Sequence, residues 1–214
     1  MRIKERRDKE LRRGKATRPP RRRVLIACEG DKLEPAYLNG LRQALSLDKQ
    51  RVVILPSGND SAPLRVVKAA LLEHKRQEQS FDHILCVVDR DTHPSFDEAC
   101  RFVADHKLGR SGVLKLVVSV PCFEVWLLLH LTSYSTAAYQ NATEAKARME
   151  KLMPGYAQRG SGLYAGLKIG QAQAVQSAKR LDGEHIKNGS DGNPSTDMPL
   201  LLTLLEELAA EARW

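Results

Sequence analysis

Two short apolar runs that end on carboxylates constrain the fold of this chain more than any other feature of its sequence. One run is Val24–Cys28, followed by Glu29, and the other is Ile84–Val88, followed by Asp89-Arg90-Asp91. Apolar runs of this length are typical of strands buried on both faces of a parallel sheet. The carboxyl ends of such strands gather ligand sites at one edge of the sheet. If the two strands are neighbours, their carboxylates meet there; a plain turn is the alternative reading of the Asp-x-Asp stretch.

Strands alternate with helices over the first two thirds of the chain. The strand pattern recurs at residues 51–55 and 113–120, and helix patterns at 34–45, 63–79 and 95–107 separate the strands. This alternation predicts a three-layer α/β/α fold with a four-stranded parallel sheet. Beyond residue 136 the pattern is helical only. We therefore expect an α/β core over residues 24–135 and an all-helical C-terminal extension over 136–214 packed on the core.

The positive charge of the chain is concentrated at its start. The formal net charge is +8, yet residues 1–23 hold twelve basic and three acidic side chains, a balance of +9, which leaves −1 for the remaining 191 residues. A segment with so few apolar residues cannot bury enough surface to fold alone, so we expect a disordered tail. The tail lies along the phosphates of a nucleic acid, or it contacts nothing in particular.

The sequence also indicates where the protein works. No apolar segment follows the basic residues as in a secretory signal, and no later run reaches membrane-spanning length. The four cysteines show no CxxC pairing. They are expected to be reduced and mostly buried, as in a cytoplasmic protein without a membrane partner.

The carboxylates at the sheet edge favour a hard divalent cation. Clustered carboxylates repel one another unless a cation holds them. Because no His or Cys cluster accompanies them, the oxygen ligands favour Mg²⁺ or Mn²⁺ over Zn²⁺. Glu124 joins this set because it opens an apolar helix after the fourth strand, where a carboxylate is costly to bury unless it is paired or metal-bound. The expected metal ligands are Glu29, Asp89, Asp91 and Glu124.

Other polar side chains are candidates for a part in catalysis. Glu34 lies in the first turn of the helix after Glu29 and points back to the same edge, so either glutamate can serve as general base. Arg159 lies in a glycine-rich loop and could clamp a phosphate, with a mobile connector as the alternative. Lys168 and Lys179 have weaker claims. His130, on the apolar helix, is expected to be a hydrogen-bonded core histidine.

Five stretches of the chain have a recognisable pattern. They are Val24–Gly30, Glu34–Tyr37, Asp89–Asp91 with His93-Pro94, Pro121–His130 and Asn193–Thr196. The acid-glycine after the first strand and the Asp-x-Asp after the third resemble the Toprim domain of topoisomerases, primases and nucleases. Taken together and in this order, the stretches resemble the RloB family over about residues 22–205.

The resemblance implies a Toprim/Rossmann-like core in a protein of restriction and phage-defence loci, often beside a partner ATPase. By this likeness Glu29, Asp89 and Asp91 are the Toprim acids. Glu34 matches the second glutamate of the related overcoming-lysogenisation-defect nucleases. Those relatives also use a late lysine, whose counterpart in this sequence stays open, and Arg159 lies about where a basic residue is expected.

We therefore expect a Mg²⁺-dependent nuclease that acts in anti-phage defence and binds DNA or RNA. The alternative is a non-catalytic nucleic-acid-binding or scaffold subunit of a defence complex. A phosphatase or phosphoacceptor is disfavoured because such proteins carry their acidic pair after the first strand. A Walker phosphate loop and a Ser/His/Asp arrangement are both absent from the sequence, so any ATP-driven step belongs to a partner.

Overall fold

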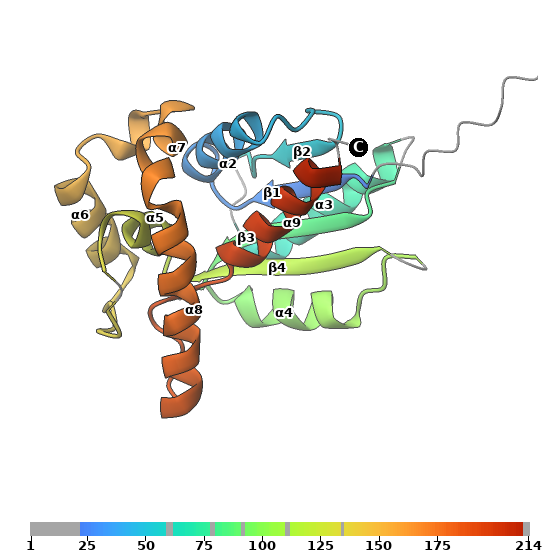
Figure 1. The fold of residues 1–214 in the computed structure, drawn as a ribbon. Coiled ribbons are helices and arrows are strands. Elements are labelled where there is room, and N and C mark those ends of the chain that lie inside the picture. Colours follow the sequence, from blue (N-terminus) through green and yellow to red (C-terminus); the bar gives the residue numbers. More distant parts are fainter. Residues whose placement is uncertain are drawn as a thin grey trace, which may run out of the picture.

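The computed structural model describes residues 22–58, 62–77, 80–90, 93–109, 112–133 and 135–211 of the chain (Figure 1). The basic tail predicted over residues 1–23 therefore lies outside the described residues except at its last two positions. Within the described part, a mixed α/β arrangement surrounds one five-stranded sheet. None of the described helices combines the length and the apolar character needed to cross a membrane.

The sheet is parallel except at one edge. Its strand order is β2-β1-β3-β4-β5, and the first four of these strands run parallel. The prediction that strands one and three are neighbours is confirmed, because Val24 pairs with His83 and the register continues along both strands. The strands are β1 (Val24–Cys28), β2 (Val52–Leu55), β3 (His83–Asp89), β4 (Val113–Val120) and β5 (Ser195–Thr196).

The prediction of four strands is wrong by one. β5 is a two-residue strand that pairs antiparallel with Ser119 and Val120 at the end of β4. Its backbone ladder is supported by a hydrogen bond between the Ser119 and Thr196 hydroxyls at 2.9 Å. The fifth strand comes from the segment assigned to the helical extension, so that segment completes the sheet.

Helices cover both faces of the sheet and give it three layers (Figure 1). On one face α3 and α4 pack against alternate strand residues such as Leu25 and Ile84. On the other face α2, α5, α8 and α9 pack against the intervening residues, such as Ile26 and Val87. The helices are α2 (Leu33–Ala44), α3 (Pro63–Arg76), α4 (Phe96–Asp105), α5 (Glu124–Leu131), α6 (Ala142–Leu152), α7 (Gly162–Leu167), α8 (Gln171–Asn188) and α9 (Met198–Glu211), with the short 3₁₀ helices η1 (Tyr156–Gln158) and η2 (Lys168–Gly170).

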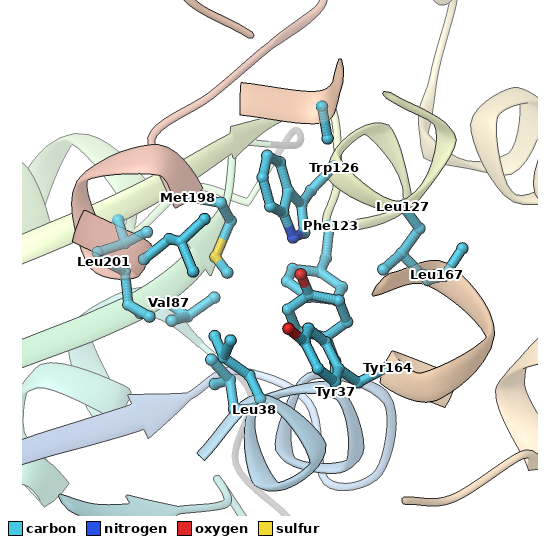
Figure 2. Close-up of a cluster of buried hydrophobic side chains, with 14 of the residues drawn as sticks. Tyr37, Leu38, Val87, Phe123, Trp126, Leu127, Tyr164, Leu167, Met198 and Leu201 are labelled. Carbon is cyan, nitrogen blue, oxygen red and sulfur yellow. The ribbon is translucent and has the colours of Figure 1, made fainter. Parts of the chain in front are cut away.

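The apolar helix α5 forms the centre of the larger core. Tyr37 of α2 makes edge-to-face contacts with Phe123, Trp126 and Tyr164 around it (Figure 2). The prediction for His130 is confirmed: its Nδ1 lies 2.8 Å from the Trp126 carbonyl oxygen and its Nε2 lies 3.2 Å from the Tyr37 hydroxyl. Burial lowers the pKa of this histidine to about 4, so it is a neutral core residue at physiological pH.

Close helix contacts lock the C-terminal helices onto the α/β part. A Cβ added at Gly40 of α2 would lie 2.6 Å from the Tyr164 Cβ, and one added at Gly170 would lie 2.0 Å from the His130 carbonyl oxygen. Only glycine allows helices to approach so closely. Residues from α2, from α5 and from the four α-helices after residue 136 therefore share one buried apolar cluster.

The amino end of the sheet is tied to the last helix by charged side chains. The buried Arg51 guanidinium donates to the Leu208 carbonyl oxygen at 2.9 Å and to the Glu211 carboxylate at 2.5 Å. Arg22, two residues before β1, also donates to Glu211, at 2.7 Å, and contacts Glu207. The basic tail therefore joins the fold at the amino end of the strands.

Candidate functional site

An acidic cavity of about 370 Å³ opens at the carboxyl end of the sheet, where β1 and β3 finish and α5 begins. The elements that form it are the loop after β1, the first turn of α2, the end of β3, the start of α5 and one side chain of α6. Its ionisable lining residues are Glu29, Asp31, Lys32, Glu34, Asp89, Glu124 and Lys146. The carboxyl ends of parallel strands are where this fold class places ligands.

Glu29 and Asp89 are joined directly because their strands are neighbours. The Asp89 backbone N–H donates to Glu29 Oε2 at 2.8 Å, and the Glu29 N–H donates to the Val87 carbonyl oxygen at 3.0 Å. The second bond carries the β1–β3 backbone ladder one step beyond β1, and the first holds the Glu29 carboxylate against the end of β3. Glu29 and Asp89 therefore line the same cavity at this edge of the sheet, as the sequence predicts.

Glu34 is folded back beneath the loop that follows β1. Its side chain is 7 % exposed, and its carboxylate accepts a backbone hydrogen bond from Gly30. A Cβ added at Gly30 would lie 2.1 Å from Glu34 Oε2, so glycine is required for this approach. Burial, and then the Glu124 carboxylate, raise the pKa of Glu34 above its ordinary value.

Glu124 enters the cavity from the first residue of α5. Its side chain is 4 % exposed, and its Oε1 accepts a hydrogen bond of 2.9 Å from the hydroxyl of Tyr156 in η1. Burial, and then this carboxylate, raise the pKa of the Tyr156 phenol. The phenol therefore stays protonated and acts as a donor to Glu124.

The electrostatics of the cavity centre on Asp89. Burial raises its pKa well above the ordinary value, and the Glu34, Glu29 and Glu124 carboxylates raise it further. The Lys146 ammonium of α6 acts in the opposite direction and lowers the pKa of Asp89. Burial lowers the pKa of the Lys146 ammonium, but Glu124, Asp89 and Glu34 raise it, and the net shift is upward. The cavity thus combines crowded carboxylates with the charged ammonium group of Lys146.

A family model described as RloB-like protein matches residues 24–205. The chain belongs to the RloB-like family. The match begins at the first residue of β1 and ends inside α9, so it spans the whole sheet and every element that lines the cavity. Comparison with curated proteins and with solved structures finds no match.

The RloB-like fold brings together four of the six predicted site residues. Glu29, Glu34, Asp89 and Glu124 line one cavity. Asp91 lies outside the described residues. Arg159 does not line this cavity; it is exposed, and its guanidinium donates to the Pro154 carbonyl oxygen at 3.4 Å. The structure thus gives Arg159 no part among the acids.

Two side chains carry no signal in the sequence: Lys146, which lines the cavity, and Tyr156, which donates to the lining residue Glu124. Lys146 lies on α6 next to the buried Ala145, and Tyr156 follows that helix in η1. On the sequence, Lys146 is an ordinary lysine of an amphipathic helix, and no local pattern marks it. The weaker lysine candidates are elsewhere: Lys168 lies in η2, and Lys179 lines a second groove between α9 and β4.

The cavity meets the requirements of a metal ion in its chemistry more than in its geometry. Among the residues that the structure describes, no group of three or more His, Cys, Asp or Glu side chains is placed to hold a metal ion. The chemistry of the lining is nevertheless that of a hard cation: carboxylate oxygens only, without His or Cys. The donor set is thus of the right type for Mg²⁺ or Mn²⁺.

Proposed function

We propose that this protein is a Mg²⁺- or Mn²⁺-dependent nuclease with a Toprim-type core. One observation carries the proposal: five carboxylates and two lysines line one cavity at the carboxyl end of a parallel sheet. Crowded carboxylates with raised pKa values are unfavourable for folding, and they are characteristic of functional sites. Their oxygen atoms are the donors that a divalent cation needs.

Glu29, Asp89, Asp91 and Glu124 would hold the cation in this proposal. When bound, the ion would supply the positive charge that activates water and stabilises the scissile phosphate and its leaving oxygen. Lys146, whose ammonium pKa is raised by the acids, stays charged and can contact a phosphate oxygen. It therefore replaces Arg159 as the basic group of the proposed site.

Glu34 is the stronger candidate for general base. Its raised pKa makes its carboxylate a better proton acceptor at neutral pH than an exposed glutamate. Glu29 already accepts the Asp89 N–H through Oε2, which suits a fixed ligand more than a group that exchanges protons. In this assignment the proton of the attacking water goes to a carboxylate oxygen of Glu34.

The biological setting is proposed on the RloB-like family alone. The resemblance of the motifs implies a role in anti-phage defence and a partner ATPase, since the sequence contains no Walker loop of its own. The basic tail would add affinity for nucleic acid without sequence readout. DNA and RNA are both proposed substrates.

A non-catalytic nucleic-acid-binding subunit is the second candidate function. It is favoured by the finding that no three acids among the described residues are placed to hold a metal ion. In that case the carboxylates of the cavity would take no part in cleavage. Both candidates predict nucleic-acid binding, so cleavage distinguishes them.

The test is a cleavage assay with a matched pair of variants. Purified protein is incubated with supercoiled plasmid, single-stranded DNA and tRNA, each with Mg²⁺, with Mn²⁺ and with EDTA. We expect metal-dependent cleavage of at least one substrate, loss of cleavage in Asp89→Asn, and retention in Asp105→Asn, an exposed acid near the end of α4. Binding without cleavage in the wild type would support the second candidate, and equal cleavage by both variants would refute the role of the cavity.

A further inference from the structure

The Tyr156–Glu124 hydrogen bond links the helical C-terminal part to the acidic cavity. Both side chains are buried, with exposed fractions of 6 % and 4 %, and the hydroxyl lies 2.9 Å from Glu124 Oε1. A carboxylate has two oxygens, and a donor on one of them fixes the plane of the group. Buried donors of this kind orient metal ligands in proteins.

The turn that carries Tyr156 is itself held in place. The Gly155 N–H donates to Glu150 Oε1 at 2.8 Å, and the Tyr156 N–H donates to the Met153 carbonyl oxygen at 3.1 Å. Gly155 has a φ of 68°, in the left-handed region that favours glycine. The phenol is therefore presented to Glu124 by a fixed backbone turn and not by a free loop.

We propose that Tyr156 is a positioning residue of the cavity: its hydroxyl holds Oε1 of Glu124 and so fixes the orientation in which this carboxylate would meet a divalent cation. This inference rests on the proposed metal-dependent function and deepens it. Tyr156 does not touch substrate in this role; it acts through Glu124. The α/β core over residues 24–135 would then be incomplete as a metal site, because the segment after it supplies both Lys146 and the group that orients Glu124.

The chain offers a matched control for removing this hydroxyl. Tyr164 is also buried, and its hydroxyl donates at 2.7 Å to Oε1 of Gln171, a residue that does not line the cavity. Tyr156→Phe and Tyr164→Phe therefore each delete one buried phenol hydroxyl with its hydrogen bond. Only the first deletion touches a proposed ligand.

The experiment measures Mn²⁺ binding by the full chain, by calorimetry and by the electron paramagnetic resonance signal of free Mn²⁺, with thermal melting in parallel. Loss of an outer hydrogen-bond partner typically weakens metal affinity by about 10- to 100-fold, and we expect Tyr156→Phe to fall in this range. Tyr164→Phe should bind Mn²⁺ as the wild type does. Added to Glu124→Ala, Tyr156→Phe should cause no further loss of affinity, because its effect passes through Glu124.

The outcomes separate this inference from the proposed function. Wild-type Mn²⁺ affinity in Tyr156→Phe would overturn the inference and leave the nuclease proposal standing. A Mn²⁺-binding wild type that cuts nothing would refute the nuclease while the affinity comparison still decides the role of Tyr156. No Mn²⁺ binding by the wild type would overturn both. If Tyr156→Phe does not fold, Glu150→Ala, which loosens the turn before Tyr156, should lower affinity, and an unchanged affinity would refute the inference.

Discussion

Replacing Gly30 by alanine should disable the cavity while leaving the fold almost intact. The added Cβ would lie 2.1 Å from Glu34 Oε2 and 2.7 Å from its Cδ, whereas ordinary contact begins at 3.4 Å. The carboxylate must therefore move by about 1.3 Å, the difference between 3.4 and 2.1 Å. This movement breaks its hydrogen bond with the Gly30 backbone.

The expected effect on activity is larger than the effect on stability. A misplacement of about 1 Å in a reacting group can cost on the order of 100-fold in rate. A hydrogen bond to a charged group contributes roughly 1.5–3 kcal/mol to stability. Part of that contribution is offset, because Glu34 leaves a buried position beside Glu124, and because alanine lowers the entropy of the unfolded chain by roughly 0.4–1 kcal/mol. We expect a net destabilisation below about 2 kcal/mol.

The assay compares cleavage, Mn²⁺ affinity and urea denaturation of Gly30→Ala with those of Gly183→Ala. Gly183 lies within α8 with no atom within 4 Å of an added Cβ, so the control should gain up to about 1 kcal/mol of stability and keep its activity. On a Glu34→Ala background, Gly30→Ala should have no further effect, because the clash partner is gone. Wild-type cleavage in the Gly30→Ala single variant would show that Glu34 has no part in the site.

Three further predictions test the acids, the amino end of the sheet and the tail. In EDTA, Asp89→Asn should raise the melting temperature at pH 8 but not at pH 3.5, and a lower melting temperature at pH 8 would contradict this. Because folding raises the pKa of Asp89, ionisation of its carboxyl destabilises the native state, and this cost grows as the pH rises from the ordinary pKa of 3.8 toward the pKa in the folded protein. In urea denaturation, Arg51→Ala should lower the free energy of unfolding by about 2–3 kcal/mol, because it removes the bonds to Leu208 and Glu211. Lys187→Ala, which removes the exposed ion pair with Glu184, should lower it by less than about 0.5 kcal/mol. Deleting residues 1–21, which spares the ion pairs of Arg22, should make nucleic-acid binding less dependent on salt. The slope of log affinity against log salt concentration should fall by roughly 0.9 for each phosphate that the tail neutralises, and an unchanged slope would mean that the tail does not contact phosphate.

The parallel strands and two of their carboxylates could be predicted because buried strands have a local signature. A run such as Val24–Cys28 is apolar at every position, and the residue that follows it is at the sheet edge whatever the rest of the chain does. Glu124 was predictable for a similar reason, as a lone charge in an apolar helix. β5 was not, because Ser195–Thr196 has no apolar pattern and becomes a strand only where the chain returns beside β4.

The place of Lys146 at the cavity depends on how the helices pack, which no local sequence pattern predicts. Lys146 faces the acids because α6 packs against α5, and the exposed side of an amphipathic helix does not specify which lysine will meet a carboxylate. Arg159 was chosen from its glycine-rich loop, a composition that indicates a turn but not its direction. Side chains from separate elements are thus predicted less well than those that follow a strand directly.

The positions of Arg22 and Glu29 at opposite ends of β1 give a length scale for the nucleic acid of the proposed function. Seven residues separate them, and an extended strand rises about 3.3 Å per residue, so the root of the tail and the acidic cavity lie about 23 Å apart. Duplex DNA rises about 3.4 Å per base pair, so a duplex that meets both must extend over about seven base pairs. Oligonucleotides shorter than this span would contact either the root of the tail or the cavity, but not both. Under the proposed function, we therefore expect tighter binding to nucleic acids longer than this span than to shorter fragments.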